Sequence, residues 1–384
     1  MLVQDLGRVV TGKTPSTKNV EYWDGAVPFI TPKDIQGTKH ISKTERCITS
    51  RGLHAVKGSI LPPRSICVSC IGNIGYVGMT NTESVSNQQI NSIVVNENND
   101  VDFVYYLMKS LWRFFKNYEG QSTALSILNK TQFSQIEVDV PDISVQREIA
   151  AALSALDDKI ENNAKINHHL EQMARAIFKS WFVDFEPFGG VRPSDWREGT
   201  LADIASVTMG QSPDGSSYNE SGTGTVFYQG RTDFGSRFPT RRLFTTQPKR
   251  MAIEGDILVS VRAPVGDLNV AAEPCCLGRG LAGIQSKSGN QSFILYTMFA
   301  LKQQLDMFNG EGTVFGSINK NDMATLSVVI PTDEVVQQFE SIVKPMDETI
   351  RNNFDEICHL QAARDTLLPR LMSGELSVAD NAAK

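Results

Sequence analysis

The side chains of this 384-residue chain that could bind a metal or carry out redox chemistry are few and poorly spaced. Cys67 and Cys70 form a C-x-x-C pair, a spacing that serves metal or redox sites when further ligands accompany it. No second pair lies nearby, and the apolar setting favours two residues of a β-strand. Neither the adjacent pair Cys275–Cys276 nor the adjacent pair His168–His169 can easily present two ligands to one ion. We therefore expect no metal site.

The features of a nuclease or a nucleotide-dependent enzyme are also missing. Asp157, Asp158 and Lys159 could suggest a nuclease cluster, but they fall in a segment with helical spacing, where we expect them on the solvated side. The chain has no G-x-x-x-x-G-K-[ST] loop. The stretch "LPPR" (61–64) lacks the Asn and the aromatic residue with which amino-methyltransferases hold a target base. We predict that the chain is not an enzyme and holds no cofactor.

The remaining candidates for chemistry are cationic side chains, which gather in two windows. Residues 33–64 contain seven Lys or Arg against two Asp or Glu, and residues 231–262 contain seven against three, although the net charge of the chain is −6. Each window alone could be an ordinary solvated face. Two such windows at matching places favour one long anionic partner, and DNA phosphates are the natural candidate.

The two windows lie in two copies of one sequence pattern. "SILNKTQFSQIEVDVP" (126–141) is repeated as "GSINKNDMATLSVVIP" (316–331), at an offset of 190 residues. "DLGRVVTGKTP" (5–15) resembles "DIASVTMGQSP" (203–213), at an offset of 198. A period this long indicates a domain duplication and not a solenoid. The change of offset indicates insertions or deletions inside the globular parts.

Each copy reads as a globular domain followed by a long helix. Short alternating apolar runs between Gly- and Pro-rich turns predict strands, and a few helical stretches interrupt them, so we expect an α+β fold. The predicted boundaries are globular domains at 1–143 and 186–331, helical regions at 144–185 and 332–376, and a flexible tail at 377–384.

The two helical regions carry apolar residues at alternating steps of four and three, which is the spacing of a coiled coil. A single amphipathic helix on its own domain is the alternative, but about 33 residues, or roughly 50 Å, is long for that role. The predicted seam residues are Leu153, Leu156, Ile160, Asn163, Asn167, Leu170, Val343, Met346, Ile350, Asn353, Ile357 and Leu360. Asparagine in a seam lowers stability but fixes register. In a centred antiparallel pair, Asn167 faces Asn353. Pro345 departs from the pattern because proline can kink or begin a helix.

With these elements in order, the chain resembles the specificity subunit of type I restriction–modification enzymes. No single motif carries the resemblance; the ordered set in duplicate does, over essentially the whole chain. The matching stretches are "VSCIGNIGYVGM" (68–79) with "SNQQINSIV" (86–94), "VSVRAPVGDLNVA" (259–271) with "CCLGRGLAGI" (275–284), "VPDISVQREIAAALSALDDKIENN" (140–163) and "LLPRLMSGEL" (367–376).

The resemblance implies two target-recognition domains, each reading one half of a split sequence in double-stranded DNA. It also implies that the two helices form an antiparallel coiled coil, related by a pseudo-twofold repeat, that sets the spacer. Two methyltransferase (modification) subunits, which use S-adenosylmethionine, would dock on the chain. Restriction subunits, which use ATP and Mg, are further partners that the resemblance allows.

Candidate DNA contacts are Lys, Arg and Gln side chains in the basic windows and the matching stretches, because these side chains bind phosphates and read base edges. In the first domain they are Lys33, Arg64, Gln88 and Gln89; in the second they are Arg231, Arg237, Arg241, Arg242, Arg262 and Arg279. Lys33 and Arg231 occupy similar places in the two copies.

Two other classes of protein remain open from the sequence. One is a duplicated DNA-modifying enzyme, and the other is a protein-interaction scaffold that does not read DNA. The six scattered cysteines and the lack of a long apolar run favour a reduced, cytoplasmic protein with no membrane contact.

Overall fold

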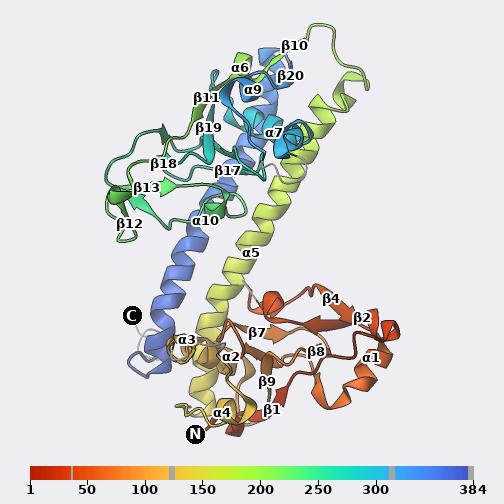
Figure 1. Cartoon of the computed structure of the whole chain (residues 1–384), viewed down its shortest axis with the longest axis vertical. Helices are drawn as coiled ribbons and strands as arrows, with labels where there is room; N and C mark the ends of the chain where they lie inside the picture. Colours follow the sequence, from red (N-terminus) through yellow and green to blue (C-terminus); the bar gives the residue numbers. More distant parts are fainter. Residues whose placement is uncertain (36–37, 121–125, 311–315, 379–384) are drawn as a thin grey trace. The chain divides into compact units, whose positions relative to one another are not determined.

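The computed structural model describes residues 1–35, 38–120, 126–310 and 316–378. They form two compact units: unit 1 is Met1–Ala164 with Asp355–Lys384, and unit 2 is Lys165–Phe354. Residues 379–384 of the expected tail lie outside the described residues. Each unit combines a globular α+β part with a portion of the two long helices α5 (Ile143–Phe182) and α10 (Asp333–Met372) (Figure 1). No helix within the described ranges is long and apolar enough to cross a membrane.

The globular part of unit 1 contains two β-sheets. The first consists, in spatial order, of β1 (Gly7–Thr11), β9 (Ile90–Val95), β6 (Ile66–Ser69), β7 (Val77–Thr80) and β3 (His40–Ile41). The second consists of β4 (Arg46–Ile48), β2 (Trp23–Ile30), β8 (Ser84–Ser86) and β5 (Ile60–Leu61). The helices of this part are α1 (Ser50–Ala55), α2 (Val101–Ser110), α3 (Trp112–Gly120) and α4 (Lys130–Ser134).

The core of unit 1 joins its first sheet to the long helices. All four residues of β6 are buried, as expected for a strand in the middle of a covered sheet. One apolar cluster includes Val68 of β6, Phe103 of α2 and Leu153 of α5. The first sheet, α2 and α5 therefore share one core, so the globular part is packed on the helix and is not a loose appendage.

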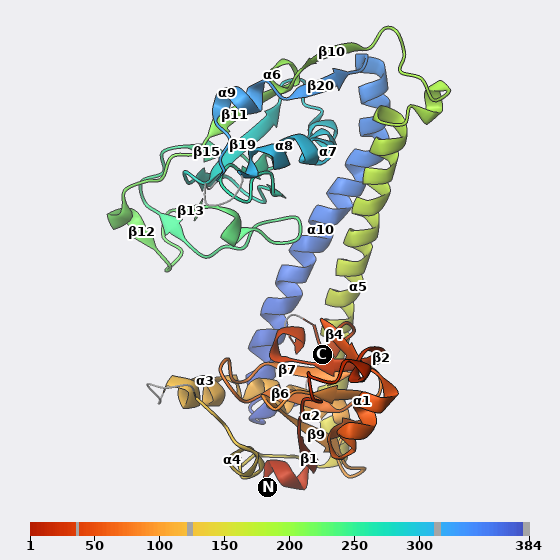
Figure 2. The same ribbon diagram turned by 45° about the vertical axis from the view of Figure 1, so that its right-hand side comes forward.

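Unit 2 repeats this construction. Its first sheet consists, in spatial order, of β11 (Ala205–Met209), β19 (Leu281–Ser286), β16 (Ile257–Ser260) and β17 (Leu268–Val270). Its second consists of β12 (Tyr218–Asn219), β14 (Phe244–Thr245), β13 (Thr225–Tyr228), β18 (Cys275–Leu277) and β15 (Met251–Ala252). β10 (Arg197–Thr200) pairs with β20 (Ser327–Ile330) beside the start of α10 (Figure 2). The shorter helices are α6 (Leu201–Ile204), α7 (Gln291–Ala300), α8 (Lys302–Asp306) and α9 (Lys320–Ala324).

The strand orders confirm the duplication read from the sequence. The order β1-β9-β6-β7 corresponds to β11-β19-β16-β17, and β4-β2-β8-β5 corresponds to β14-β13-β18-β15. The chain between β4 and β5 carries α1, whereas residues 246–250 connect β14 directly to β15. The offset between the copies falls at this point, from 198 residues for β1 and β11 to 191 for β6 and β16. Most of the length difference therefore lies in one connection of the second sheet, and its last residue lies between β9 and α2, where the offset falls to 190.

The repeated Asn-Lys step marks the start of two short helices. The side-chain oxygen of Asn129 accepts a 3.0 Å hydrogen bond from the backbone N–H of Gln132 in α4. The side-chain oxygen of Asn319 accepts one of the same length from the N–H of Asp322 in α9. In both, the asparagine satisfies an N–H group that the first helical turn leaves unpaired.

α5 and α10 each contain 40 residues, and their first residues lie 190 positions apart. At 1.5 Å per residue each helix is about 60 Å long, which exceeds the expected length. α10 continues through Pro345, and the hydroxyl of Thr349 donates a 2.8 Å hydrogen bond to the Pro345 carbonyl. Pro345 therefore neither begins nor ends the helix.

Within unit 1 the two helices run antiparallel. Arg364 of α10 lies 2.7 Å from Asp157 of α5, and the side-chain amide of Asn163 donates a 2.6 Å hydrogen bond to Glu356. Moving forward along α5 thus means moving backward along α10. Asn163 is buried at 1% exposure, so its amide depends on this partner.

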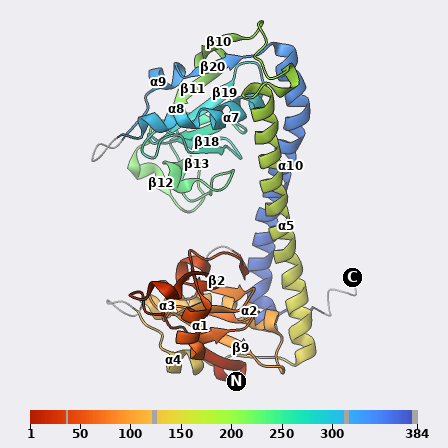
Figure 3. The ribbon, with the colours of Figure 1, turned by 90° about the vertical axis from the view of Figure 1, so that its right-hand side faces the viewer.

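The helix portions in unit 2 also lie side by side and antiparallel (Figures 1 and 3). Asn167 of α5 is hydrogen-bonded to Asn353 of α10, and the rings of Phe178 and Phe339 lie 5.8 Å apart between centroids. Phe293 of α7 contacts Phe178 and belongs to the same apolar cluster as these two rings, so α7 packs against α5.

Every residue predicted for the helix seam is buried or half-buried. Those in unit 1 are Leu153, Leu156, Ile160, Asn163, Ile357 and Leu360. Those in unit 2 are Asn167, Leu170, Val343, Met346, Ile350 and Asn353. The alternating steps of four and three therefore mark the covered faces of both helices.

Candidate nucleic-acid interface

Three chain segments of unit 1 meet where β1, β2 and β8 end. The backbone N–H of Lys13 donates a 2.8 Å hydrogen bond to the Ser86 carbonyl. The N–H of Asn87 donates a 2.9 Å hydrogen bond to the Ile30 carbonyl. The strand ends are thus tied together, and the residues that follow them emerge at one place. We call this place the loop corner of unit 1, which comprises residues 11–14, 30–33 and 86–89.

Unit 2 has the same arrangement at the repeat-equivalent residues. The N–H of Gln211 donates a 2.9 Å hydrogen bond to the Leu277 carbonyl, and the N–H of Gly278 donates a 2.8 Å hydrogen bond to the Tyr228 carbonyl. The loop corner of unit 2 comprises residues 209–212, 228–231 and 277–280. Two sequences that differ at most positions thus build one backbone frame.

A hairpin lies against each loop corner. The N–H of Cys70 donates a 2.7 Å hydrogen bond to the Gln89 carbonyl in unit 1, and the N–H of Val261 donates a 2.9 Å hydrogen bond to the Gly280 carbonyl in unit 2. Side chains from the turn after β6 or β16 can therefore join those of the three loops.

One glycine in each loop corner allows the close approach of the segments. A Cβ atom on Gly12 would lie 2.0 Å from the carbonyl oxygen of Asn87, and one on Gly210 would lie 2.1 Å from that of Gly278. Both distances are far below van der Waals contact, so neither position tolerates a side chain.

Three of the four predicted contacts of the first domain lie in the loop corner of unit 1. Lys33 has 82% of its side chain exposed. Gln88 is exposed, and its side-chain oxygen accepts a 2.6 Å hydrogen bond from the hydroxyl of Thr14. Gln89 is half-buried next to it. The predicted contacts in this corner are therefore one cation and two amides.

The matching place in unit 2 presents arginines. Arg231 has 53% of its side chain exposed, and its Nε lies 2.8 Å from a carboxylate oxygen of Asp267. Arg279 and Arg262 are exposed on the third loop and on the hairpin. Neither forms an ion pair with any residue that the structure describes. Unpaired, exposed guanidinium groups can bind phosphate oxygens or guanine edges.

Two further predicted contacts flank the loop corner of unit 2. Arg241 is exposed and pairs with Glu273. Arg242 lies 3.0 Å from Asp233, whose side chain is only 1% exposed and also accepts a hydrogen bond from the backbone N–H of Gln229. The ion pair of Arg242 with Asp233 thus helps to hold the loop that begins at Gln229 in place.

Arg64 lies outside the loop corner. Its backbone has a φ of +64°, and its guanidinium lies 2.7 Å from Asp102 in α2. Lys39 contacts the other oxygen of this carboxylate at 2.7 Å. Burial raises the pKa of Asp102, but the hydrogen bonds from Lys39 and Arg64 outweigh it and hold the pKa below its ordinary value. Arg64 is thus engaged in joining β5 and β6 to α2.

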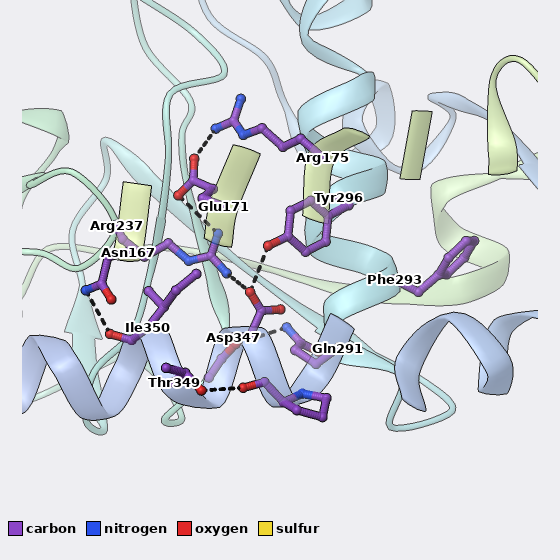
Figure 4. A network of polar contacts seen from close by, with 12 residues as sticks. Asn167, Glu171, Arg175, Arg237, Gln291, Phe293, Tyr296, Asp347, Thr349 and Ile350 are labelled. Carbon is purple, nitrogen blue, oxygen red and sulfur yellow. Dashed lines mark hydrogen bonds and ion pairs between the residues drawn. The ribbon is translucent and has the colours of Figure 1, made fainter. Parts of the chain in front are cut away.

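Arg237 is buried and cannot be the DNA contact that the sequence suggested. Its guanidinium lies 2.5 Å from Asp347 of α10 and 3.4 Å from Glu171 of α5, with 8% of the side chain exposed (Figure 4). The hydroxyl of Tyr296 donates a 2.8 Å hydrogen bond to the same Asp347. Arg237 therefore fastens the globular part of unit 2 to both long helices.

The repeat-equivalent network in unit 1 corrects a second expectation. Asp157 is not on a solvated face: its carboxylate accepts a 2.6 Å hydrogen bond from Tyr106 and pairs with Arg364 at 2.7 Å. Tyr106 and Asp157 correspond to Tyr296 and Asp347 at the offset of 190. The apparent acidic cluster is thus a structural contact between α2 and α5, and not part of a nuclease site.

The cysteine and histidine pairs show no metal chemistry among the described residues. Cys67 lies in β6, and Cys70 follows it directly; both are buried. Burial raises the pKa of the Cys67 thiol to about 12 and that of Cys70 to about 11, so both stay protonated and unreactive at neutral pH. The expectation of two strand residues is confirmed for Cys67 and is wrong for Cys70, which lies one position after β6.

The sequence expectations missed three exposed residues of the loop corners. Lys13 follows β1, Gln211 follows β11 at the repeat-equivalent place, and Gln229 follows β13. The available signal for Lys13 and Gln211 was the alignment of "TGKTP" with "MGQSP", in which a fixed glycine precedes a polar residue that differs between the copies.

Comparison with known proteins agrees with the duplicated architecture. The family described as "Type I restriction modification DNA specificity domain" matches residues 2–172 and 193–358. The chain is similar to the type I restriction enzyme MjaIX specificity subunit of Methanocaldococcus jannaschii, with 29% identity over 409 residues that cover 98% of this chain and 93% of the relative. It is also similar to the putative type I restriction enzyme MjaX specificity subunit of that organism, with 30% identity over 306 residues, covering 75% and 72%.

A solved structure shares the fold. The crystal structure of the Type-I restriction-modification system S subunit from M. genitalium superposes with a TM-score of 0.61 at 16% identity, covering 97% of this chain and 95% of that one.

Proposed function

Because the chain belongs to the family of type I restriction modification DNA specificity domains, we propose that it is the subunit that gives a type I restriction–modification complex its DNA sequence specificity. Each globular part, at 1–143 and 186–331, is a target-recognition domain that reads one half of a split sequence. The observation that carries this proposal is the duplicated loop corner, where one rigid backbone frame presents exposed cationic and amide side chains in each unit.

The side chains of the loop corners have the chemistry that DNA recognition needs. Lys and Arg neutralise phosphates and bind guanine edges, and Gln binds adenine edges in the major groove. The proposed contacts are Lys33, Gln88 and Gln89 in unit 1 and Arg231, Arg241, Arg262 and Arg279 in unit 2. Arg64, Arg237 and Arg242 are assigned to the support of the domains.

The long helices supply the spacer in this proposal. Two half-sites on one face of a duplex lie about one turn, or roughly 34 Å, apart. An antiparallel coiled coil of helices about 60 Å long is sufficient to set such a separation. The antiparallel contacts within each unit support this arrangement. The coiled coil also docks two modification subunits, which carry S-adenosylmethionine, so the chain itself recognises DNA without catalysing a reaction.

The test is binding of the full chain, assembled with its modification subunits, to a library of randomised duplex DNA. We expect selection of a bipartite sequence with an unread spacer. The logarithm of the binding constant should fall linearly with the logarithm of the salt concentration. Binding without sequence preference would support the scaffold alternative. Methyl transfer or cleavage by the chain alone would support the duplicated enzyme.

A further inference from the structure

The two loop corners share a backbone frame, and three of the positions at which they differ are exposed in both copies. Position 13 corresponds to 211, position 33 to 231 and position 88 to 279. These pairs read Lys and Gln, Lys and Arg, and Gln and Arg, and all six residues are exposed. The frame beside them, by contrast, keeps its glycine and its backbone hydrogen bonds in both units.

In each loop corner a hydroxyl group forms a hydrogen bond with the residue at position 88 or its equivalent, 279. Thr14 donates its hydroxyl to the side chain of Gln88 at 2.6 Å. Ser212, the equivalent of Thr14, accepts a 3.2 Å hydrogen bond from the backbone N–H of Arg279. A side chain on such a fixed base loses less conformational freedom on binding, which favours a precise contact over a diffuse electrostatic one.

We propose that positions 13, 33 and 88, with their equivalents 211, 231 and 279, determine which bases each half-site contains. This inference rests on the proposed function and adds to it the residues that make the two halves differ, Lys13 and Gln211 among them.

The chemistry of the pairs predicts the direction of the difference. Arginine binds O6 and N7 of guanine with two hydrogen bonds, and glutamine binds N6 and N7 of adenine. Arg279 therefore reads a guanine in the half-site of unit 2, and Gln88 reads an adenine at the corresponding place in the other half-site. By the same rule, Arg231 also reads a guanine in the half-site of unit 2.

The experiment is a reciprocal exchange, Gln88→Arg and Arg279→Gln, each in the full chain assembled with its modification subunits. Bound sequences are selected from randomised duplex DNA and counted. We expect R279Q to change one base position in one half-site from guanine towards adenine, by roughly five- to 150-fold in relative binding. Q88R should produce the opposite change in the other half-site. The spacer and the other base positions should stay as they are.

Matched controls make the same chemical changes outside the loop corners. Arg197→Gln alters an exposed arginine of β10, and Gln135→Arg alters an exposed glutamine after α4. Both should leave every base preference unchanged. Thermal melting of all four variants should match the wild type, because all four positions are exposed.

The possible outcomes separate this inference from the proposed function. If the wild-type complex selects a split sequence but R279Q and Q88R select the same one, the assignment of these positions is wrong and the proposed function stands. A loss of binding that is equal for all sequences would make them phosphate contacts and would also overturn it. If the wild type selects no sequence, the proposed function itself fails.

Discussion

The side-chain amide of Asn353 in α10 donates a 2.8 Å hydrogen bond to the side-chain oxygen of Asn167 in α5. Asn167 donates its own amide to the carbonyl of Ile350 at 3.1 Å. The heptad spacing of the sequence predicted this pair, and the prediction is confirmed. Because the neighbouring seam residues Leu170 of α5 and Ile350 of α10 are apolar, a shift that placed either of them opposite an amide of the pair would leave that amide without a partner.

Asn353→Leu alone should lower the free energy of unfolding by about 1–3 kcal/mol, because it leaves the half-buried side-chain oxygen of Asn167 without its donor. Replacing both asparagines with Leu should restore or raise stability while loosening the register. Urea unfolding measures the stability, and light scattering after size exclusion measures whether one species persists. A double variant that unfolds like wild type and stays monodisperse would contradict a role in register.

Arg237 and Arg241 should behave in opposite ways although they are only four residues apart. Arg237→Ala leaves Asp347 and Glu171 without their buried cation and should cost about 3–5 kcal/mol. Arg241→Ala removes an exposed pair and should cost no more than about 1 kcal/mol. Urea unfolding gives both values. Only R241A should reduce the salt dependence of DNA binding; the reverse pattern would return Arg237 to the interface.

Asp102 should make the stability of unit 1 depend on acid. Its pKa is lowered in the folded state, so the unfolded chain holds the proton more tightly. The stabilisation by the ionised carboxylate is complete above the ordinary aspartate pKa of about 3.9 and is lost as the pH falls through the folded-state value. Asp102→Asn should therefore unfold in less urea than wild type at neutral pH, and the difference should shrink in acid.

A second aspartate provides the control for this acid test. Asp158→Asn changes an exposed residue of α5 and should give the same urea midpoint as wild type at every pH. A stability difference between D102N and wild type that stays constant from neutral pH into acid would show that the ion pairs with Lys39 and Arg64 contribute nothing.

The long helices should set the length of the unread spacer between the two half-sites. Matched insertions of one heptad in α5 and α10 add about 10 Å to each helix, which corresponds to about three base pairs. The selected DNA should gain spacer of that order and keep both half-sites. Seven Gly and Ser residues placed in the connection at 246–250 are the control and should not alter the spacer. Half-sites that change after the heptad insertion would contradict this role of the helices.

The sequence was sufficient for those features that follow from periodicity. The steps of four and three predicted the covered faces of both helices, and centred antiparallel packing of those helices placed Asn167 against Asn353. The duplication of the globular parts followed from the matching stretches in the same way. These features depend on spacing along one element or between two copies, which a linear pattern retains.

The burial of Arg237 and Asp157 could not be read in this way. Both are charged residues in polar stretches, and charged residues are usually exposed. Their burial depends on Tyr296 and Tyr106, which come from helices more than 50 positions away in each case. A usable signal was nevertheless present, because the Tyr and the Asp recur together at the offset of 190, as residues with a shared structural role would.

Asp157 and Asp347 occupy equivalent positions in the two copies, but their arginine partners come from different elements. Asp157 takes Arg364 from the neighbouring long helix, whereas Asp347 takes Arg237 from the globular part. In unit 2 this contact of the globular part with α10 is an ion pair, whereas in unit 1 Tyr106 and Lys39 connect the globular part to α5 through hydrogen bonds to Asp157 and Ser154. The two copies thus conserve the aspartate and the tyrosine but attach their globular parts to the long helices with different charges.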